Sequence, residues 1–280
     1  MTLVQLSRVA IHTAAGDEIV SRVDLEIDHG EIVGVIGESG SGKSMTLKAI
    51  AGLLPTGVVA RGSIDYEGTE LLTQTRSEYR AFRDREIGIV YQDPRAAVNP
   101  VHTVGDFLTE ALRVNRKFGR VEARARAEQL CAEVGIPDPA HVLDSYPYQF
   151  SGGMLQRAVI AAALATEPRL ILADEPTTAL DVTRQAEVAA LLRAQVRDRG
   201  IGMMFITHDL ELAAALCDRV YVMYRGRIVD TFAAADLMGA THPYTRALLA
   251  ARPSIEQGRG ARLATIDDEL RAQIDTEVGL

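Results

Sequence analysis

Residues 32–54 read IVGVIGESGSGKSMTLKAIAGLL and carry the plainest structural signal in the chain. The apolar run at 32–36 is rich in β-branched residues and predicts a short strand, whereas 45–54 has the composition of a helix. The eight residues 37–44 between them fit the pattern G-x-x-x-x-G-K-[ST], which is meaningful only between a strand and a helix. This context predicts an α/β fold with a phosphate-binding loop.

The residue types of this loop suit a triphosphate. Glycines without side chains let consecutive backbone N–H groups converge on an anion, and the positive end of the following helix dipole adds to the attraction. Lys43 is placed to reach the β and γ phosphates, and the Ser44 hydroxyl is placed to bind Mg²⁺. The chain is therefore predicted to bind a nucleoside triphosphate. The predicted contacts from the loop are Gly37, Glu38, Ser39, Gly40, Ser41, Gly42, Lys43, Ser44 and Met45.

Two further apolar runs end in groups suited to hydrolysis. RLILADEP (169–176) predicts a strand that ends in Asp174 and Glu175. Ligands gather at the carboxyl ends of parallel strands, so Asp174 is expected to hold Mg²⁺ and Glu175 to polarise the attacking water as a general base. MMFITHD (203–209) places His208 at another strand end, where it suits contact with the γ-phosphate or orientation of the water.

FSGGM (150–154) indicates a second anion site. Ser151 is a good N-cap residue, and the residues after it have the composition of a helix, so N–H groups and a hydroxyl are exposed at a helix N-terminus. The phosphate loop already surrounds the triphosphate of its own chain. Ser151, Gly152 and Gly153 are therefore predicted to bind the γ-phosphate that another subunit holds.

The composition narrows the classes of protein. The chain has 280 residues, of which 47% are hydrophobic, enough for one large domain or two modest ones. A formal net charge of −8 argues against a nucleic-acid partner, which needs clustered Lys and Arg. No run approaches the roughly 18 apolar residues of a transmembrane helix, and the N-terminus lacks a secretory signal. These features favour a cytosolic chain.

Six motifs, taken in order, resemble those of the ATP-binding subunits of ATP-binding cassette (ABC) transporters. GESGSGKS resembles the Walker A motif and LILADE the Walker B motif. FSGGM resembles the signature motif, with Met154 where the common form has Gln. The Q-loop, the D-loop and the switch histidine match Gln92 in YQDP, Asp181 in ALD and His208. The resemblance runs from about residue 3 to about residue 253.

The resemblance implies an ABC-type nucleotide-binding domain. Such a domain has a RecA-like core, an N-terminal antiparallel β subdomain and an inserted helical subdomain, here expected at about 94–165. The ATPase domain is expected at 1–253, followed by a short C-terminal tail at 254–280. Apolar residues at helix-like spacing in this tail predict an amphipathic helix that packs on its own domain or contacts a partner.

The family's site roles are carried over onto matching positions. The family usually stacks an aromatic ring on adenine, and the matching position here is Ile11, with His12 beside it. Ile11 is therefore expected to supply an apolar contact and His12 a ring. In the family Gln92 senses the γ-phosphate. The predicted catalytic residues are Glu175, His208 and Gln92, and the predicted Mg²⁺ ligands are Ser44, Gln92 and Asp174.

The family also implies partners. Two ATPase subunits form a head-to-tail dimer with two ATP molecules at the interface, and the dimer drives two transmembrane permease subunits. THPYTRALLAARP (241–253) resembles the oligopeptide, dipeptide and nickel importers, which work with an extracytoplasmic substrate-binding protein. The expected protein is a peripheral ATPase at the cytoplasmic face of the cell membrane, paired with an identical or a different homologous subunit.

The cargo and two other classes of protein stay open. Peptides are the expected cargo, and nickel or a metal chelate is the alternative. Many peptide importers carry a C-terminal cysteine cluster, but no cysteine follows Cys217, so no iron–sulfur cluster is expected. A soluble ABC ATPase of DNA repair typically has long coiled coils, which do not fit here. A nucleotide sensor without turnover is disfavoured by Glu175 and His208.

Overall fold

A six-stranded sheet carries the phosphate loop in this computed structural model, which describes residues 1–178, 180–250, 272 and 274–276. Its strands lie in the order β10-β9-β3-β8-β7-β6, and all neighbours are parallel except the pair β9 and β10. The strand before the loop is buried along its whole length, as expected of a parallel strand covered on both faces. The bounds are β3 Ile32–Ile36, β6 Ile87–Val90, β7 Leu170–Asp174, β8 Gly202–Thr207, β9 Arg219–Tyr224 and β10 Arg227–Ala233.

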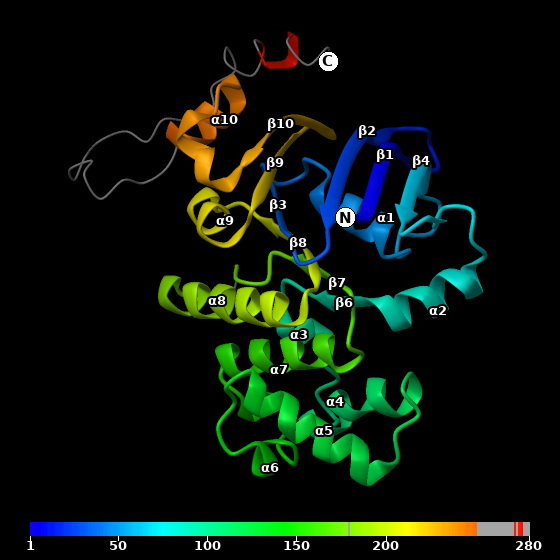
Figure 1. Cartoon of the computed structure of the whole chain (residues 1–280), viewed down its shortest axis with the longest axis vertical. Helices are drawn as coiled ribbons and strands as arrows, with labels where there is room; N and C mark the ends of the chain where they lie inside the picture. The colour runs from blue at the N-terminus through cyan, green and yellow to red at the C-terminus, as the bar shows by residue number, and fades with distance from the viewer. Residues whose placement is uncertain (179, 251–271, 273, 277–280) are drawn as a thin grey trace, which may run out of the picture.

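A second, antiparallel sheet lies beside the first (Figure 1). Its four strands take the order β2-β1-β4-β5, with bounds β1 Thr2–His12, β2 Glu18–Asp28, β4 Val59–Tyr66 and β5 Thr69–Glu70. The side chains of β3 alternate between two cores. Val33 and Val35 pack with the antiparallel sheet, whereas Ile32 and Ile36 pack in the core on the helical side. The phosphate loop therefore begins at a strand that is clamped from both faces.

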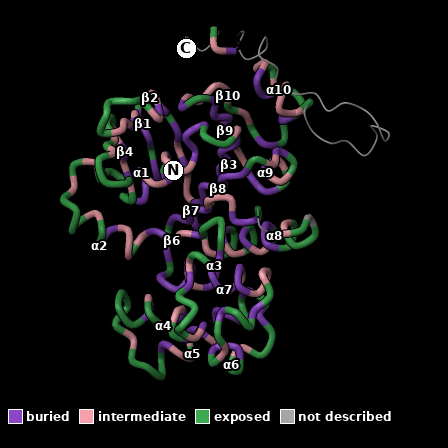
Figure 2. The backbone as a smooth tube through the Cα atoms, turned by 180° about the vertical axis from the view of Figure 1, so that it is seen from behind, coloured by how far each residue is buried: buried purple, intermediate pink, exposed green. Residues whose placement is uncertain are grey.

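Helices fill the rest of the molecule. Figure 1 shows α4 to α7 gathered at the end opposite α10. The tube in Figure 2 shows buried segments both at this end and in the part that holds the two sheets. The α-helices are α1 Lys43–Ile50, α2 Arg76–Glu86, α3 Pro94–Ala97, α4 Val104–Val114, α5 Arg120–Glu133, α6 Pro139–Val142, α7 Gly152–Ala165, α8 Val182–Arg199, α9 Leu210–Leu216 and α10 Pro243–Ala250. Two 3-10 helices among the described residues are η1 Pro147–Gln149 and η2 Ala234–Gly239.

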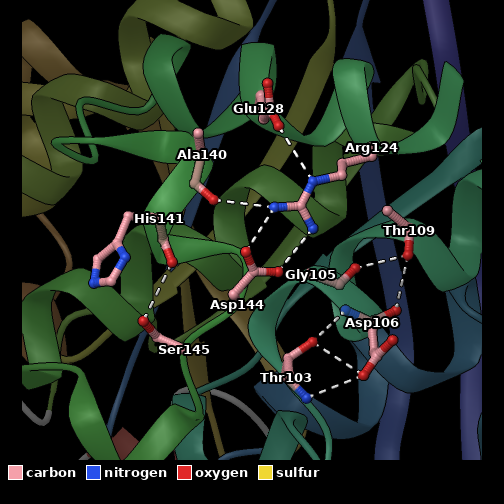
Figure 3. Close-up of polar contacts among 10 residues, drawn as sticks. All are labelled: Thr103, Gly105, Asp106, Thr109, Arg124, Glu128, Ala140, His141, Asp144 and Ser145. Carbon is pink, nitrogen blue, oxygen red and sulfur yellow. Dashed lines mark hydrogen bonds and ion pairs between the residues drawn. The ribbon is translucent and has the colours of Figure 1, made fainter. Parts of the chain in front are cut away.

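Surface polar contacts fix how the helices of residues 94–165 begin and meet (Figure 3). Thr103 caps α4 in a capping box, accepting from the Asp106 N–H at 3.0 Å while the Asp106 carboxylate accepts from the Thr103 N–H. The guanidinium of Arg124 on α5 donates to both carboxylate oxygens of Asp144 at 2.8 and 2.9 Å and to the carbonyl of Ala140. These bonds set the orientation of α5 against α6, while the apolar core supplies the stability.

Two sequence-based expectations concern the tail and the membrane. The predicted tail helix over 254–280 lies outside the described residues except for 272 and 274–276. Among the described helices, none combines the length and the apolar character needed to cross a bilayer.

Candidate active site

The phosphate loop leaves β3 at Ile36 and enters α1 at Lys43. Gly37 has φ 152°, and a Cβ on it would lie 2.1 Å from the carbonyl oxygen of Met223 on β9, so only glycine fits. Gly42, the N-cap of α1, has φ 105° and offers no side-chain oxygen. No side chain of the N-cap therefore takes up the first N–H groups of α1, which suits the predicted binding of an anion.

Lys43 lies inside the loop that it closes. Its ammonium donates to the carbonyl oxygens of Gly37 and Glu38 at 2.8 Å each, and only 5% of the residue is exposed. Burial lowers the pKa of Lys43, while the charges of Glu175 and Asp174 oppose that shift. The ammonium charge therefore lies inside the loop, next to two carbonyl oxygens that a bound phosphate can replace as its hydrogen-bond partners.

Asp174 ends β7 directly beside the start of α1. The hydroxyl of Ser44 donates to its Oδ1 at 2.8 Å. Burial raises the pKa of Asp174, and the Ser44 hydrogen bond opposes the shift. A carboxylate and a hydroxyl oxygen at hydrogen-bond distance beside a phosphate loop match the few hard oxygen ligands that Mg²⁺ takes from protein. The residues present therefore fit Mg²⁺.

Glu175 is held in an unusual backbone conformation at the same edge. Its φ of 45° is rare for a residue with a side chain, and its N–H donates to the carbonyl of Ile206 on β8 at 3.1 Å. Its Oε2 accepts from the hydroxyl of Thr178 at 2.9 Å and lies 3.4 Å from both Gln92 Nε2 and His208 Nδ1. Thr178, Gln92 and His208, which come from three segments of the chain, therefore orient the carboxylate of Glu175.

A cavity of about 430 Å³ joins these groups. It is lined by Ile19, Ser39, Gly40, Gly42, Lys43, Ser44, Met45, Gln92, Glu175 and His208. The loop and the three predicted catalytic residues thus meet in one space. Asp174 does not line the cavity itself but accepts a hydrogen bond from Ser44, which does. Glu38 and Ser41 do not line it either, and each accepts a hydrogen bond from the ammonium of Lys43.

The expected adenine contact of Ile11 is wrong. Ile11 pairs with Val20 across the antiparallel sheet, and both are 0% exposed. Ile19, the neighbour of Val20, points to the other face of β2 and lines the cavity instead. His12 is half-buried and is not among the residues that line this cavity.

The signature and D-loop residues lie elsewhere. Ser151 is the N-cap of α7 and accepts from the Met154 N–H at 3.3 Å. Asp181 is the N-cap of α8 and forms an ion pair with Arg184 at 3.3 Å. Neither these two caps nor Gly152 and Gly153 line the cavity in the described part of the chain.

Three contacts of the site have no counterpart among the sequence-based predictions. Thr178 orients Glu175, Ile19 lines the cavity, and the buried Tyr244 accepts from the Glu38 N–H at 3.1 Å. A threonine three residues after the predicted catalytic carboxylate is a usable local signal. The other two depend on strand register and on a pairing across 206 residues, which no local pattern reveals.

Comparison with known proteins bears on the same region. Residues 20–178 match the family described as ABC transporter. The chain is 44% identical over 259 residues to the "Probable peptide ABC transporter ATP-binding protein y4tR" of Sinorhizobium fredii, covering 90% of this chain and 77% of that one. It is 40% identical over 286 residues to the "Dipeptide transport ATP-binding protein DppD" of Escherichia coli, covering 100% and 86%.

A solved structure shares the fold. The dimeric, post-hydrolysis ATP-binding cassette MJ0796, bound to ADP and Pi, superposes with a TM-score of 0.73 at 28% identity. The match covers 82% of this chain and 98% of that chain. The predicted α/β fold of the ABC type is confirmed.

Proposed function

Since this chain belongs to the family of ABC transporter ATP-binding subunits, we propose that it hydrolyses ATP to power the import of di- or oligopeptides. One observation carries the site assignment. The carboxylate of Glu175 shares a cavity with Lys43 and Ser44, and groups from three segments aim it. That arrangement suits a base opposite a bound triphosphate.

In the proposed reaction the chain's own groups bind, orient and move a proton. Backbone N–H groups of the loop and the ammonium of Lys43 bind the β and γ phosphates. Glu175 accepts a proton from the attacking water while Gln92 and His208 hold the carboxylate and the water in line. Ser44, Asp174 and Gln92 would hold Mg²⁺, which would neutralise negative charge on the phosphate oxygens. Ile19, which lines the cavity, supplies an apolar contact for the adenine ring, and the predicted ring contact from His12 stays a prediction.

We assign the signature to a second subunit's nucleotide. Added Cβ atoms at Gly152 and Gly153 would meet their nearest neighbours, outside the chain neighbours and the helix's own backbone, at only 4.0 and 3.6 Å, an ordinary contact distance. Packing within this chain therefore does not require glycine at either position. Ser151, Gly152, Gly153 and Met154 leave room for a phosphate from outside, with Asp181 at the same interface. The solved relative MJ0796 is dimeric in its post-hydrolysis state, which supports this arrangement.

The relatives named as peptide transport ATP-binding proteins, together with this assignment, support the following partners. We propose that residues 1–253 form the ATPase domain, with 94–165 as its helical subdomain. The domain pairs with a second homologous ATPase subunit, identical or different. The pair acts at the cytoplasmic face of the cell membrane on two transmembrane permease subunits, and an extracytoplasmic binding protein delivers the cargo.

The cargo is tested on the assembled transporter. The chain is co-reconstituted in proteoliposomes with its permease subunits and binding protein, and ATP hydrolysis is measured with a dipeptide, a pentapeptide, Ni²⁺ or a nickel chelate present. Stimulation by a peptide that the binding protein also binds is expected. Stimulation by Ni²⁺ or a nickel chelate alone would replace the peptide assignment by the metal alternative.

Lys43→Ala is expected to weaken binding of MgATP to the isolated chain roughly 10- to 100-fold, because a hydrogen bond to a charged group contributes about 1.5–3 kcal/mol. Isothermal titration measures this dissociation constant. Lys117→Ala removes a lysine from an exposed position outside the cavity and serves as the control. Equal affinities of the two variants would remove Lys43 from the phosphate site.

A further inference from the structure

Tyr244 connects α10 to the phosphate loop from outside the cavity. It lies beyond the matched residues 20–178 and is 0% exposed. Its ring packs against Tyr224 with centroids 4.6 Å apart at 51°. Its hydroxyl oxygen accepts from the backbone N–H of Glu38 at 3.1 Å. A polar contact between a buried side chain and the loop backbone is therefore built into the C-terminal part of the fold.

The peptide unit between Gly37 and Glu38 is held on both sides. Its carbonyl accepts from the ammonium of Lys43 at 2.8 Å, and its N–H donates to Tyr244. In a trans peptide these two groups point in opposite directions. The peptide plane cannot rotate without breaking both bonds, so the entry to the loop is fixed in one orientation.

The glycines in and near this peptide allow its backbone to rotate, so its orientation has to be held by other groups. Gly37 has φ 152° and Gly40 has φ 82°, and glycine permits rotations that other residues resist. On the proposed function, Lys43 turns to the triphosphate when ATP binds and leaves the carbonyl of Gly37. The hydroxyl of Tyr244 then still holds the N–H end of the same peptide.

The hydroxyl itself is rigidly placed. Thr245, which follows Tyr244 on α10, is 0% exposed, and its hydroxyl donates to the carboxylate of Asp230 on β10 at 2.7 Å. Tyr224 ends β9, which pairs in register with β3 at Val222 and Ile36. The hairpin of β9 and β10 also touches the loop, because the Gly226 N–H donates to the Ser41 carbonyl at 2.8 Å. Tyr244 is thus fixed relative to the strand from which the loop emerges.

We propose that Tyr244 is a positioning residue of the ATP site, which keeps the Gly37–Glu38 peptide in its nucleotide-binding orientation. The inference rests on the proposed function and deepens it. Without the hydroxyl, loop conformations that do not bind phosphate become populated, and the apparent affinity falls by the fraction of loops that stay competent. The chemical step, carried by Glu175, is left unchanged.

The test compares two single-hydroxyl deletions in the full chain. Tyr244→Phe keeps the buried ring and removes the bond to Glu38, whereas Tyr224→Phe keeps the neighbouring ring and removes a hydroxyl that donates to Asp275. Tyr244→Phe is expected to raise the dissociation constant of MgADP and the KM for MgATP about fivefold, the size of one lost hydrogen bond. Its kcat is expected to stay within about twofold, and Tyr224→Phe to match the parent in all three, because Asp275 lies outside the loop.

Hydrogen exchange supplies a readout that general destabilisation does not move. Exchange at the Glu38 amide of the nucleotide-free chain is expected to be faster in Tyr244→Phe, with the strands of the central sheet exchanging as in the parent. Parental affinity in Tyr244→Phe, or an equal loss in both variants, would overturn the positioning role. A parental chain that binds no MgATP would instead overturn the proposed function, and the positioning role with it.

Discussion

Glu175→Gln is expected to lower kcat for ATP hydrolysis by about 10³-fold, within the range of a lost general base. The amide is close in size and shape to the carboxylate, so Thr178 and Gln92 can still hold the side chain, but it cannot accept a proton from water. The affinity for MgATP is expected to remain close to that of the parent. Dimers with trapped ATP should therefore accumulate.

The measurement combines steady-state hydrolysis with size-exclusion chromatography in MgATP. Glu187→Gln is the matched control, since this glutamate sits on α8 with 56% of its side chain exposed and pairs with Arg157. A Glu175→Gln variant that hydrolyses ATP at the parental rate would contradict the general-base assignment. Loss of nucleotide binding along with turnover would mean that the residue holds the site together instead.

Ser151→Arg is expected to abolish transport, while MgATP binding to the isolated chain stays within about threefold of the parent. Loss of the N-cap costs α7 about 1 kcal/mol, which the buried helix tolerates. The new side chain fills the space before the first N–H groups of α7 and blocks approach of another subunit's phosphate. Because Ser151 does not line the chain's own cavity, that cavity is undisturbed.

Transport in proteoliposomes and ATP binding by isothermal titration separate these two effects. Ser77→Arg places the same side chain in the exposed first turn of α2 and should transport at the parental rate. An active Ser151→Arg transporter would exclude the cross-subunit role of the signature. A variant that fails to bind ATP as an isolated chain would show that α7 supports its own site.

Local motifs were enough to predict most of the candidate site. In residues 37–44 the glycine positions, the strand before and the helix after fix the backbone within a few residues, so Lys43 and Ser44 could be assigned from their spacing. Asp174 and Glu175 follow the apolar residues 170–173, His208 follows the largely apolar residues 203–207, and parallel strands bring their carboxyl ends to one edge. The class of sheet was enough to predict that Glu175 and His208 meet at one cavity and that Asp174 lies beside it, bonded to Ser44.

Contacts across the sheets could not be predicted in this way. Whether Ile11 or Ile19 faces the cavity depends on which face of each strand turns inward, and a shift of one residue in register exchanges the two faces. The bond from Glu38 to Tyr244 joins residues 206 apart and exists because β9 pairs with β3 and α10 returns over its end. The sequence alone therefore determined the chemistry of the site, because each motif sets its own backbone. Tertiary structure decided what supports that chemistry, because long-range packing selects the neighbours.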